Sequence, residues 1–368
     1  MTVDLFAPYK IGLMELRNRF VRSATWDGTA DGTGVVTDSS VAMYRELGQG
    51  GVGLIISGFA FISPLAQVGH GQYGAHTDDM IPGLRRLAQA AQQGGAKIAL
   101  QIVHGGINSN YLPRKGITSL AVSASERRNR PHREMTEDDI ETIIADFAAA
   151  ARRAKEAGFD AVQLHGAHGY LMCQFLSPLF NQRTDRWGGS AENRRRFHIE
   201  VLRRIRREVG ADFPVLIKFG VQDDREEGLT LSDGLETGRQ MIKAGISGIE
   251  VSAGFGNIMH AAEKGEPEWV YFRQRTAAVK QAVAVPVMMV GGIRRLETAK
   301  EIVASGDADL ISMCRPFIRE PDLIVRWQRG DEELARCISC SHCFATTSGG
   351  EGLKCAEELR LREEAANA

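Results

Sequence analysis

The sequence alternates eight times between a short apolar run and a stretch whose apolar residues recur at helical spacing. Most of the short runs are continuous in Val, Ile, Leu and Phe, a pattern typical of parallel strands that helices cover on both faces. The eight pairs occupy residues 18–315 and predict an α/β protein with a single (β/α)₈ TIM barrel, whose active site lies at the carboxyl ends of its strands. The expected strands are Arg19–Ala24, Gly53–Ser57, Lys97–Val103, Ala161–His165, Val215–Phe219, Gly248–Ser252, Val287–Val290 and Leu310–Met313.

Capping residues mark the ends of several expected helices. Thr136 precedes an acidic turn and the segment IETIIADFAAAARRAKEAG, and Ser232 precedes GLETGRQMIKAG. Gly158 and Gly245 stand where these two helices end. A doubly wound open sheet is the alternative fold, but no G-x-G-x-x-G follows the first strand, as dinucleotide-binding sheets of that type usually require.

Two connections, 105–135 after the third strand and 169–190 after the fourth, are too long to be simple turns. Long ordered loops on a barrel usually carry function. We expect a barrel domain over residues 1–330 and a short cysteine-containing extension, residues 331–368, packed on it.

The charge balance and the apolar runs exclude several classes of partner. Forty-five Lys and Arg residues against 46 Asp and Glu leave a net charge of -1, so no overall field attracts nucleic acid or an anionic membrane surface. No apolar run has the length of a membrane span, and the amino terminus lacks the apolar core of a secretory signal. We therefore expect a cytoplasmic protein that acts on a small molecule, without nucleic-acid or membrane binding.

The densest polar cluster begins where the fourth strand ends, with His165, His168 and Tyr170. Two imidazoles three residues apart can converge on one anionic or carbonyl oxygen, and the tyrosine can act there as a proton donor. The alternative is a pair of histidines hydrogen-bonded in a loop or a metal site, although no acidic ligand stands nearby. We therefore treat these residues as candidate catalytic residues.

Further polar residues close neighbouring strands. Gln101 and His104 end the third strand and Lys218 ends the fifth, which directs them to the same barrel mouth. A buried lysine needs an anionic partner, and a ring that becomes negatively charged on reduction would supply one. A nearby carboxylate is the alternative partner.

A candidate phosphate site follows the last two strands. Gly291 and Gly292 come directly after the seventh strand and allow backbone amides to approach a phosphate. Arg315, after the eighth strand, would clamp the same phosphate, because barrel phosphate sites usually combine these two loops.

The chain resembles the Old Yellow Enzyme family of NADH:flavin oxidoreductases and ene-reductases over residues 4–343. The likeness rests on LFAPYKIG, LRNRFVRSA, AGFDAVQLHGAHGYLMCQFLSPLFNQRTDRWGGSAENRRRF and GDADLISMCRPFIREPDL. The resemblance implies an FMN-dependent enzyme that takes hydride from NAD(P)H and reduces the C=C bond of an α,β-unsaturated carbonyl compound, an enone or enoate. It also implies a homo-oligomer.

The resemblance assigns roles to individual residues. His165 and His168 would hold the activating oxygen of the substrate, with Tyr170 as the proton donor. By the same resemblance, Trp26 would stand beside the flavin where family members carry Cys or Thr, and it would narrow the pocket. The implied FMN-binding residues are Ala24, Thr25, Trp26, Gln101, Lys218, Gly291, Gly292 and Arg315.

Four cysteines, Cys337, Cys340, Cys343 and Cys355, cluster after the last barrel helix. Thiolates with two-residue gaps favour zinc or an iron–sulfur cluster. The spacing is similar to that of the dienoyl-CoA reductases and trimethylamine dehydrogenase, in which one 4Fe–4S cluster relays electrons to FMN. A 4Fe–4S cluster, a zinc ion and four reduced thiols all stay open here.

Besides the ene-reductase, two other activities are compatible with this sequence. One is a flavin dehydrogenase subunit that passes electrons through an iron–sulfur cluster to a partner protein. The other is a flavin-free phosphate-binding barrel such as an aldolase or isomerase. A non-catalytic binding role is disfavoured by the ionisable side chains expected in one barrel mouth.

Overall fold

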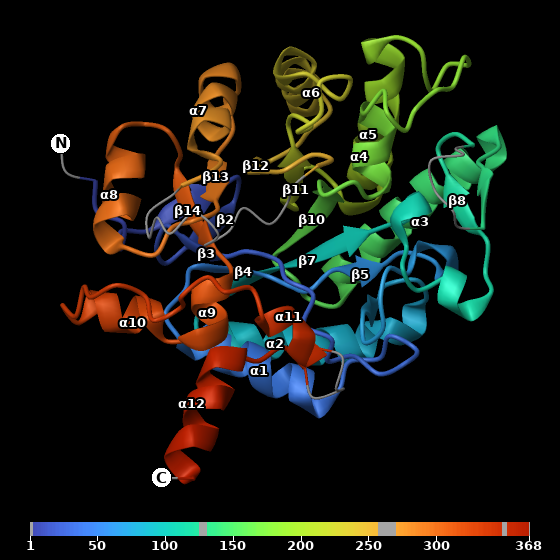
Figure 1. Cartoon of the computed structure of the whole chain (residues 1–368). Helices are drawn as coiled ribbons and strands as arrows, with labels where there is room; N and C mark the ends of the chain where they lie inside the picture. The colour runs from blue at the N-terminus through green and yellow to red at the C-terminus, as the bar shows by residue number, and fades with distance from the viewer. Residues whose placement is uncertain (1–2, 125–130, 257–269, 348–351, 368) are drawn as a thin grey trace.

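Eight parallel strands close into a barrel at the centre of the molecule, and helices surround them (Figure 1). The computed structural model describes residues 3–124, 131–256, 270–347 and 352–367. Neighbouring barrel strands follow one another in the chain, and the pairing of the last strand with the first closes the barrel. The barrel strands are β3 (Phe20–Arg22), β4 (Leu54–Ile56), β7 (Lys97–Val103), β10 (Ala161–Gly166), β11 (Val215–Gly220), β12 (Gly248–Ser252), β13 (Val287–Val290) and β14 (Leu310–Met313).

The strand register brings the predicted polar residues side by side. Gln101 of β7 pairs with Gln163 of β10, and His165 of β10 pairs with Lys218 of β11. All residues of β10, β11 and β12 are buried, which explains their nearly continuous apolar sequence. Every expected strand is confirmed: four have the expected bounds, and the other four differ by one or two residues at one or both ends.

The helices begin and end largely where the capping residues predict. Thr136 caps α3, and its side chain accepts a hydrogen bond from the backbone of Asp139. The prediction for the sixth helix was two residues late, because Thr230 rather than Ser232 accepts the capping bond and α6 begins at Leu231. The outer helices are α1 (Asp38–Gln49), α2 (Ile81–Gln93), α3 (Glu137–Glu156), α5 (Ala191–Val209), α6 (Leu231–Lys243), α7 (Arg273–Ala282) and α8 (Leu296–Ala304).

A short hairpin lies at the amino-terminal end of the barrel. Strands β1 (Tyr9–Ile11) and β2 (Met14–Leu16) pair antiparallel, and their buried side chains pack against the apolar floor of the barrel. The loop after the third barrel strand adds the short strands β8 (Ser119–Ala121) and β9 (His132–Glu134). The loop after the fourth strand contains α4 (Leu171–Leu176).

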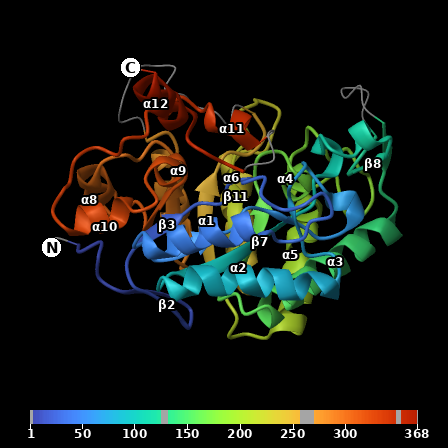
Figure 2. The ribbon, with the colours of Figure 1, turned by 90° about the horizontal axis from the view of Figure 1, so that it is seen from below.

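The carboxy-terminal residues cover the opposite end of the barrel from β2 (Figure 2). They carry α9 (Arg315–Arg319), α10 (Leu323–Gln328), α11 (Cys343–Thr346) and α12 (Ala356–Ala366). The backbone N–H of Leu353 donates to the carbonyl of Asp27, and that of Ala335 donates to the carbonyl of Arg294. Among the described residues, no helix has the length and apolar character needed to cross a bilayer.

Candidate active site

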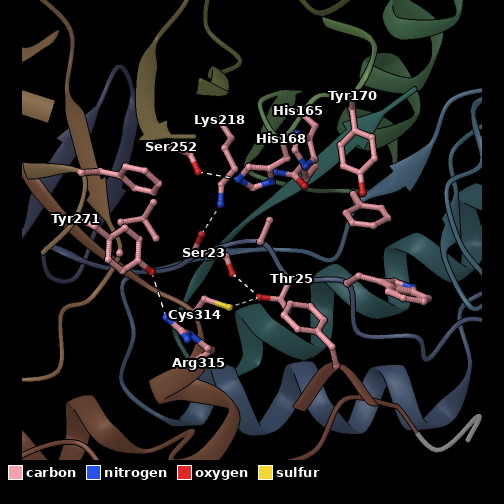
Figure 3. A pocket seen from close by; sticks show the side chains of 18 residues that line it. Ser23, Thr25, His165, His168, Tyr170, Lys218, Ser252, Tyr271, Cys314 and Arg315 are labelled. Atoms are coloured by element: carbon pink, nitrogen blue, oxygen red, sulfur yellow. Dashed lines mark hydrogen bonds between the residues drawn. The ribbon is translucent and has the colours of Figure 1, made fainter. Parts of the chain in front are cut away.

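A cavity of about 260 Å³ opens at the carboxyl ends of the barrel strands (Figure 3). All predicted catalytic and cofactor residues line it except Gly292, which lies beside the lining residue Gly291. The lining residues are Ser23, Ala24, Thr25, Trp26, Phe59, Gln101, His165, His168, Tyr170, Lys218, Ser252, Tyr271, Phe272, Val290, Gly291, Cys314, Arg315 and Phe344.

Three predicted catalytic rings meet on one side of this cavity. The ring centroid of His165 lies 5.1 Å from that of His168 and 4.9 Å from that of Tyr170. Burial lowers the pKa of His168 to about 3, with a further contribution from Lys218. Burial also lowers the pKa of His165, and the neighbouring His168 and Lys218 act in the same direction. Both imidazoles are therefore neutral at physiological pH.

The local backbone turns sharply to bring these rings together. His168 adopts a φ of 60°, a left-handed conformation that is uncommon outside glycine, and its N–H donates to the carbonyl of Ala253. Its Nε2 lies 2.8 Å from Oγ of Ser252. Burial raises the pKa of Tyr170 to about 12, so its hydroxyl keeps its proton at neutral pH. The site thus offers two neutral imidazoles and one protonated phenol.

Lys218 enters the cavity from β11 and has a carboxylate partner. Its Nζ donates to Oγ of Ser23 at 2.7 Å and lies 3.5 Å from Oε2 of Glu250. Lys218 therefore has the carboxylate partner that the sequence leaves open as the alternative, and it also lines the cavity. Sequence reasoning missed Glu250, although a single charged residue inside the apolar strand Gly248–Ser252 is a visible signal.

Gln101 presents an unused acceptor. Its Nε2 donates to Oε1 of Gln163 at 2.6 Å, whereas its buried Oε1 has no hydrogen-bond partner among the described residues. A buried amide oxygen without a donor is costly. A ligand ring with an N–H group, such as the pyrimidine ring of a flavin, would supply that donor.

The predicted phosphate donors converge on one oxygen atom. The hydroxyl of Tyr271 accepts a hydrogen bond from Nη2 of Arg315 at 3.1 Å and another from the backbone N–H of Gly292. Gly291 has a φ of 111°, and a Cβ there would lie 2.4 Å from Cε2 of Tyr271. The Gly292 N–H and the Arg315 guanidinium thus already share one oxygen atom as acceptor, and such a pair of donors fits an oxyanion. No sequence signal identified Tyr271.

The wall near strand one is formed by side chains from distant parts of the chain. Trp26 lines the cavity, with its indole N–H donating to the carbonyl of His70 at 3.0 Å. Sγ of Cys314 lies 2.7 Å from Oγ1 of Thr25. Phe344, from α11, also lines the cavity. No motif in the sequence indicates that a residue so far along the chain reaches this wall.

The four clustered cysteines line a second, smaller cavity next to the first. Cys337, Cys340, Cys343 and Cys355 all contribute to it, and Arg315 lines both cavities. In the ranges that the structure covers, no three His, Cys, Asp or Glu side chains converge closely enough to hold a single metal ion. The cysteine side chains therefore surround a space without forming a single-ion site.

Comparison with known proteins identifies the family. The sequence model of the "NADH:flavin oxidoreductase / NADH oxidase family" matches residues 4–333. The chain is 36% identical over 368 residues to an NADH oxidase of Thermoanaerobacter brockii, covering 98% of this chain and 55% of that protein. It is 33% identical over 378 residues to an N,N-dimethylglycine/sarcosine dehydrogenase of Chromohalobacter salexigens, covering 98% of this chain and 53% of that protein.

Solved structures agree with this result. The structure of a 2-naphthoyl-CoA reductase in complex with 2-naphthoyl-CoA superposes with a TM-score of 0.87 at 32% identity, over 93% of this chain and 55% of that one. The chain thus spans about half the length of these relatives. With a family model matched over most of its length and a TIM barrel of the same architecture, the chain belongs to the NADH:flavin oxidoreductase family, also called the Old Yellow Enzyme family.

Proposed function

We propose that the chain is an FMN-dependent oxidoreductase that takes hydride from NAD(P)H and reduces the C=C bond of an α,β-unsaturated carbonyl compound. One observation carries this proposal: two neutral imidazoles and a protonated phenol face the same cavity as Lys218 and Gln101. Neutral hydrogen-bond donors suit a carbonyl oxygen that gains negative charge during the reaction.

The cavity residues fit FMN. The unpaired Oε1 of Gln101 and the ammonium of Lys218 suit a flavin ring, and the donors of Gly292 and Arg315 suit its phosphate. Ala24, Thr25 and Trp26 would form the wall beside the ring. Bound FMN would supply the hydride acceptor and donor.

The side chains of this protein then have separate tasks. His165 and His168 would bind the substrate carbonyl oxygen and orient the adjacent C=C bond. Both stay neutral, so each gives a hydrogen bond without placing a fixed charge against the oxygen. Tyr170, which keeps its proton, would deliver it to the substrate carbon next to the carbonyl.

We further propose that residues 331–368 form an extension packed on the barrel of residues 1–330 and bind one 4Fe–4S cluster. Four thiols around one cavity supply the ligands of a cubane cluster. Zinc accepts the same four ligands but needs them about a single point. The spacing of these cysteines, which is similar to that of the dienoyl-CoA reductases and trimethylamine dehydrogenase, favours the cluster.

Anaerobic purification tests both cofactors. We expect non-covalent FMN at one per chain, about four iron atoms per chain, and turnover of 2-cyclohexen-1-one with NADH or NADPH. Protein without flavin would refute the oxidoreductase proposal. Zinc, or no metal with four alkylatable thiols, would refute the cluster but leave the ene-reductase in place.

A flavin dehydrogenase subunit is the second candidate. It is favoured by the position of the cysteine cavity, which shares Arg315 with the main cavity, and by similarity to a dimethylglycine dehydrogenase. Such a subunit would pass electrons to a partner protein. Anaerobic bleaching of the flavin by an N-methylated amine, without enone turnover, would support this candidate over the ene-reductase.

The cytoplasmic location and the homo-oligomer stay predictions.

A further inference from the structure

Glu250 is a charged residue in the middle of β12, with none of its surface exposed. Its carboxylate touches three neutral side chains. Ser23 and Ser312 approach Oε1 at 2.6 and 2.7 Å, and Nε2 of Gln163 approaches Oε2 at 3.0 Å. A carboxylate that is fully removed from water calls for a specific partner.

The directions of the hydrogen bonds identify its charge state. The ammonium of Lys218 has only donors, so Oγ of Ser23 accepts from it and gives its own proton to Glu250. Burial raises the pKa of Glu250, but Lys218 and the three donors outweigh burial and hold that pKa below its usual value. Glu250 is therefore an anion linked to Lys218 through Ser23 and across a direct 3.5 Å approach.

The arrangement is asymmetric with respect to the cavity. Ser23 and Lys218 line it, whereas Glu250 lies behind them and does not. Glu250 can therefore influence a ligand electrostatically and through Lys218 and Ser23, but not by direct contact. Replacing a buried ion pair by well-packed apolar side chains often leaves a protein equally stable or makes it more stable. Stability alone therefore does not explain why Glu250 and Lys218 are charged.

We propose that Glu250 is a positioning residue that offsets the charge of Lys218 and thereby lowers the reduction potential of the flavin in this cavity. The proposal rests on the proposed FMN site. Reduced flavin carries negative charge, and an unopposed ammonium beside it would stabilise the reduced form. Glu250 weakens that stabilisation, which keeps the reduced cofactor a strong hydride donor.

Glu250→Gln tests this proposal, because it keeps the shape and removes the charge. Sulfite adds to oxidised flavin and leaves an anionic adduct, so its affinity reports the same electrostatics as the potential. We expect sulfite to bind at least about tenfold more tightly, the effect of one unit charge about 12 Å away at an effective dielectric of about 20. The corresponding rise in the two-electron potential is about 30 mV.

Three further variants separate charge from structure. Ser312→Ala removes a hydrogen bond from the same carboxylate oxygen but leaves its charge, so it should change neither sulfite affinity nor potential. Glu250→Asp keeps the charge and moves it by one methylene, so it should change sulfite affinity by less than about twofold. Glu250→Leu also removes the charge, and it decides the question if Glu250→Gln does not fold.

The outcomes distinguish this inference from the function on which it rests. FMN-loaded Glu250→Gln or Glu250→Leu with unchanged or lowered potential would overturn the role of Glu250 alone. An equal shift in Ser312→Ala would also overturn it, because charge would not be the cause. Wild-type protein without flavin would overturn the proposed function and this inference together.

Discussion

Replacement of His165 by alanine tests the proposed oxyanion site most directly. His165 is 3% exposed, and among the residues that the structure describes its Nδ1 has no hydrogen-bond partner from another side chain. Its removal therefore strips one donor from the cavity without leaving another protein group unpaired. One donor to a developing oxyanion in a buried site contributes roughly 2.7–4 kcal/mol, or about 100- to 1000-fold in rate.

The loss should fall on one half-reaction. In anaerobic stopped flow, reduction of the flavin by NAD(P)H should change by less than about threefold, whereas reoxidation by an enone should slow by about 100-fold or more. His198→Ala is the matched control. His198 is also fully buried, with a pKa that burial lowers to about 3, but it lies on α5 outside the cavity. Equal slowing of both half-reactions by His165→Ala would refute the oxyanion role and indicate a role in flavin binding.

Three further results are expected. Arg315→Ala should weaken FMN binding by roughly 2–4 kcal/mol, measured by fluorescence titration. Arg294 contacts the extension without lining the cavity, so Arg294→Ala should leave FMN affinity unchanged. Equal FMN affinities of the two variants would exclude the clamp. Tyr170→Phe should slow enone turnover about 100-fold with little change in substrate affinity, and turnover at the wild-type rate would deny Tyr170 the donor role. Burial lowers the pKa of His198 from 6.5 to about 3, so its contribution to stability is complete above pH 6.5 and decreases as pH falls toward 3. The free energy of unfolding should therefore fall between pH 6.5 and 4.5, and His198→Gln should make this fall smaller by roughly 2–3 kcal/mol, measured in urea. An unchanged pH dependence would contradict a neutral buried histidine.

The sequence predicts the barrel well because buried parallel strands must be apolar along their whole length. It also places polar residues such as Gln101 and Lys218 at the correct end, since all strands of a barrel point the same way. The same rule would have found Ser252, which ends β12. The start of α6 was misplaced because Thr230 and Ser232 are both good caps, and only the backbone decides between them.

Other parts of the site depend on contacts that no spacing rule contains. Tyr271 reaches the phosphate donors through the packing of the chain before α7, and nothing in the local sequence marks it. The cysteine spacing identifies a set of ligands but not the distances between them. Those distances depend on how residues 331–347 and 352–367 lie relative to the barrel.

Phe344 makes the carboxy-terminal segment part of the candidate active-site cavity. Its ring closes one wall of the cavity, and the neighbouring segment is tied to the loop that carries Trp26 by the bond from Leu353 to Asp27. A library built to change substrate scope on this scaffold therefore has to sample α11 together with the barrel loops. A chain shortened to the eight strand–helix units alone would also lose a side chain from the wall of the candidate active site.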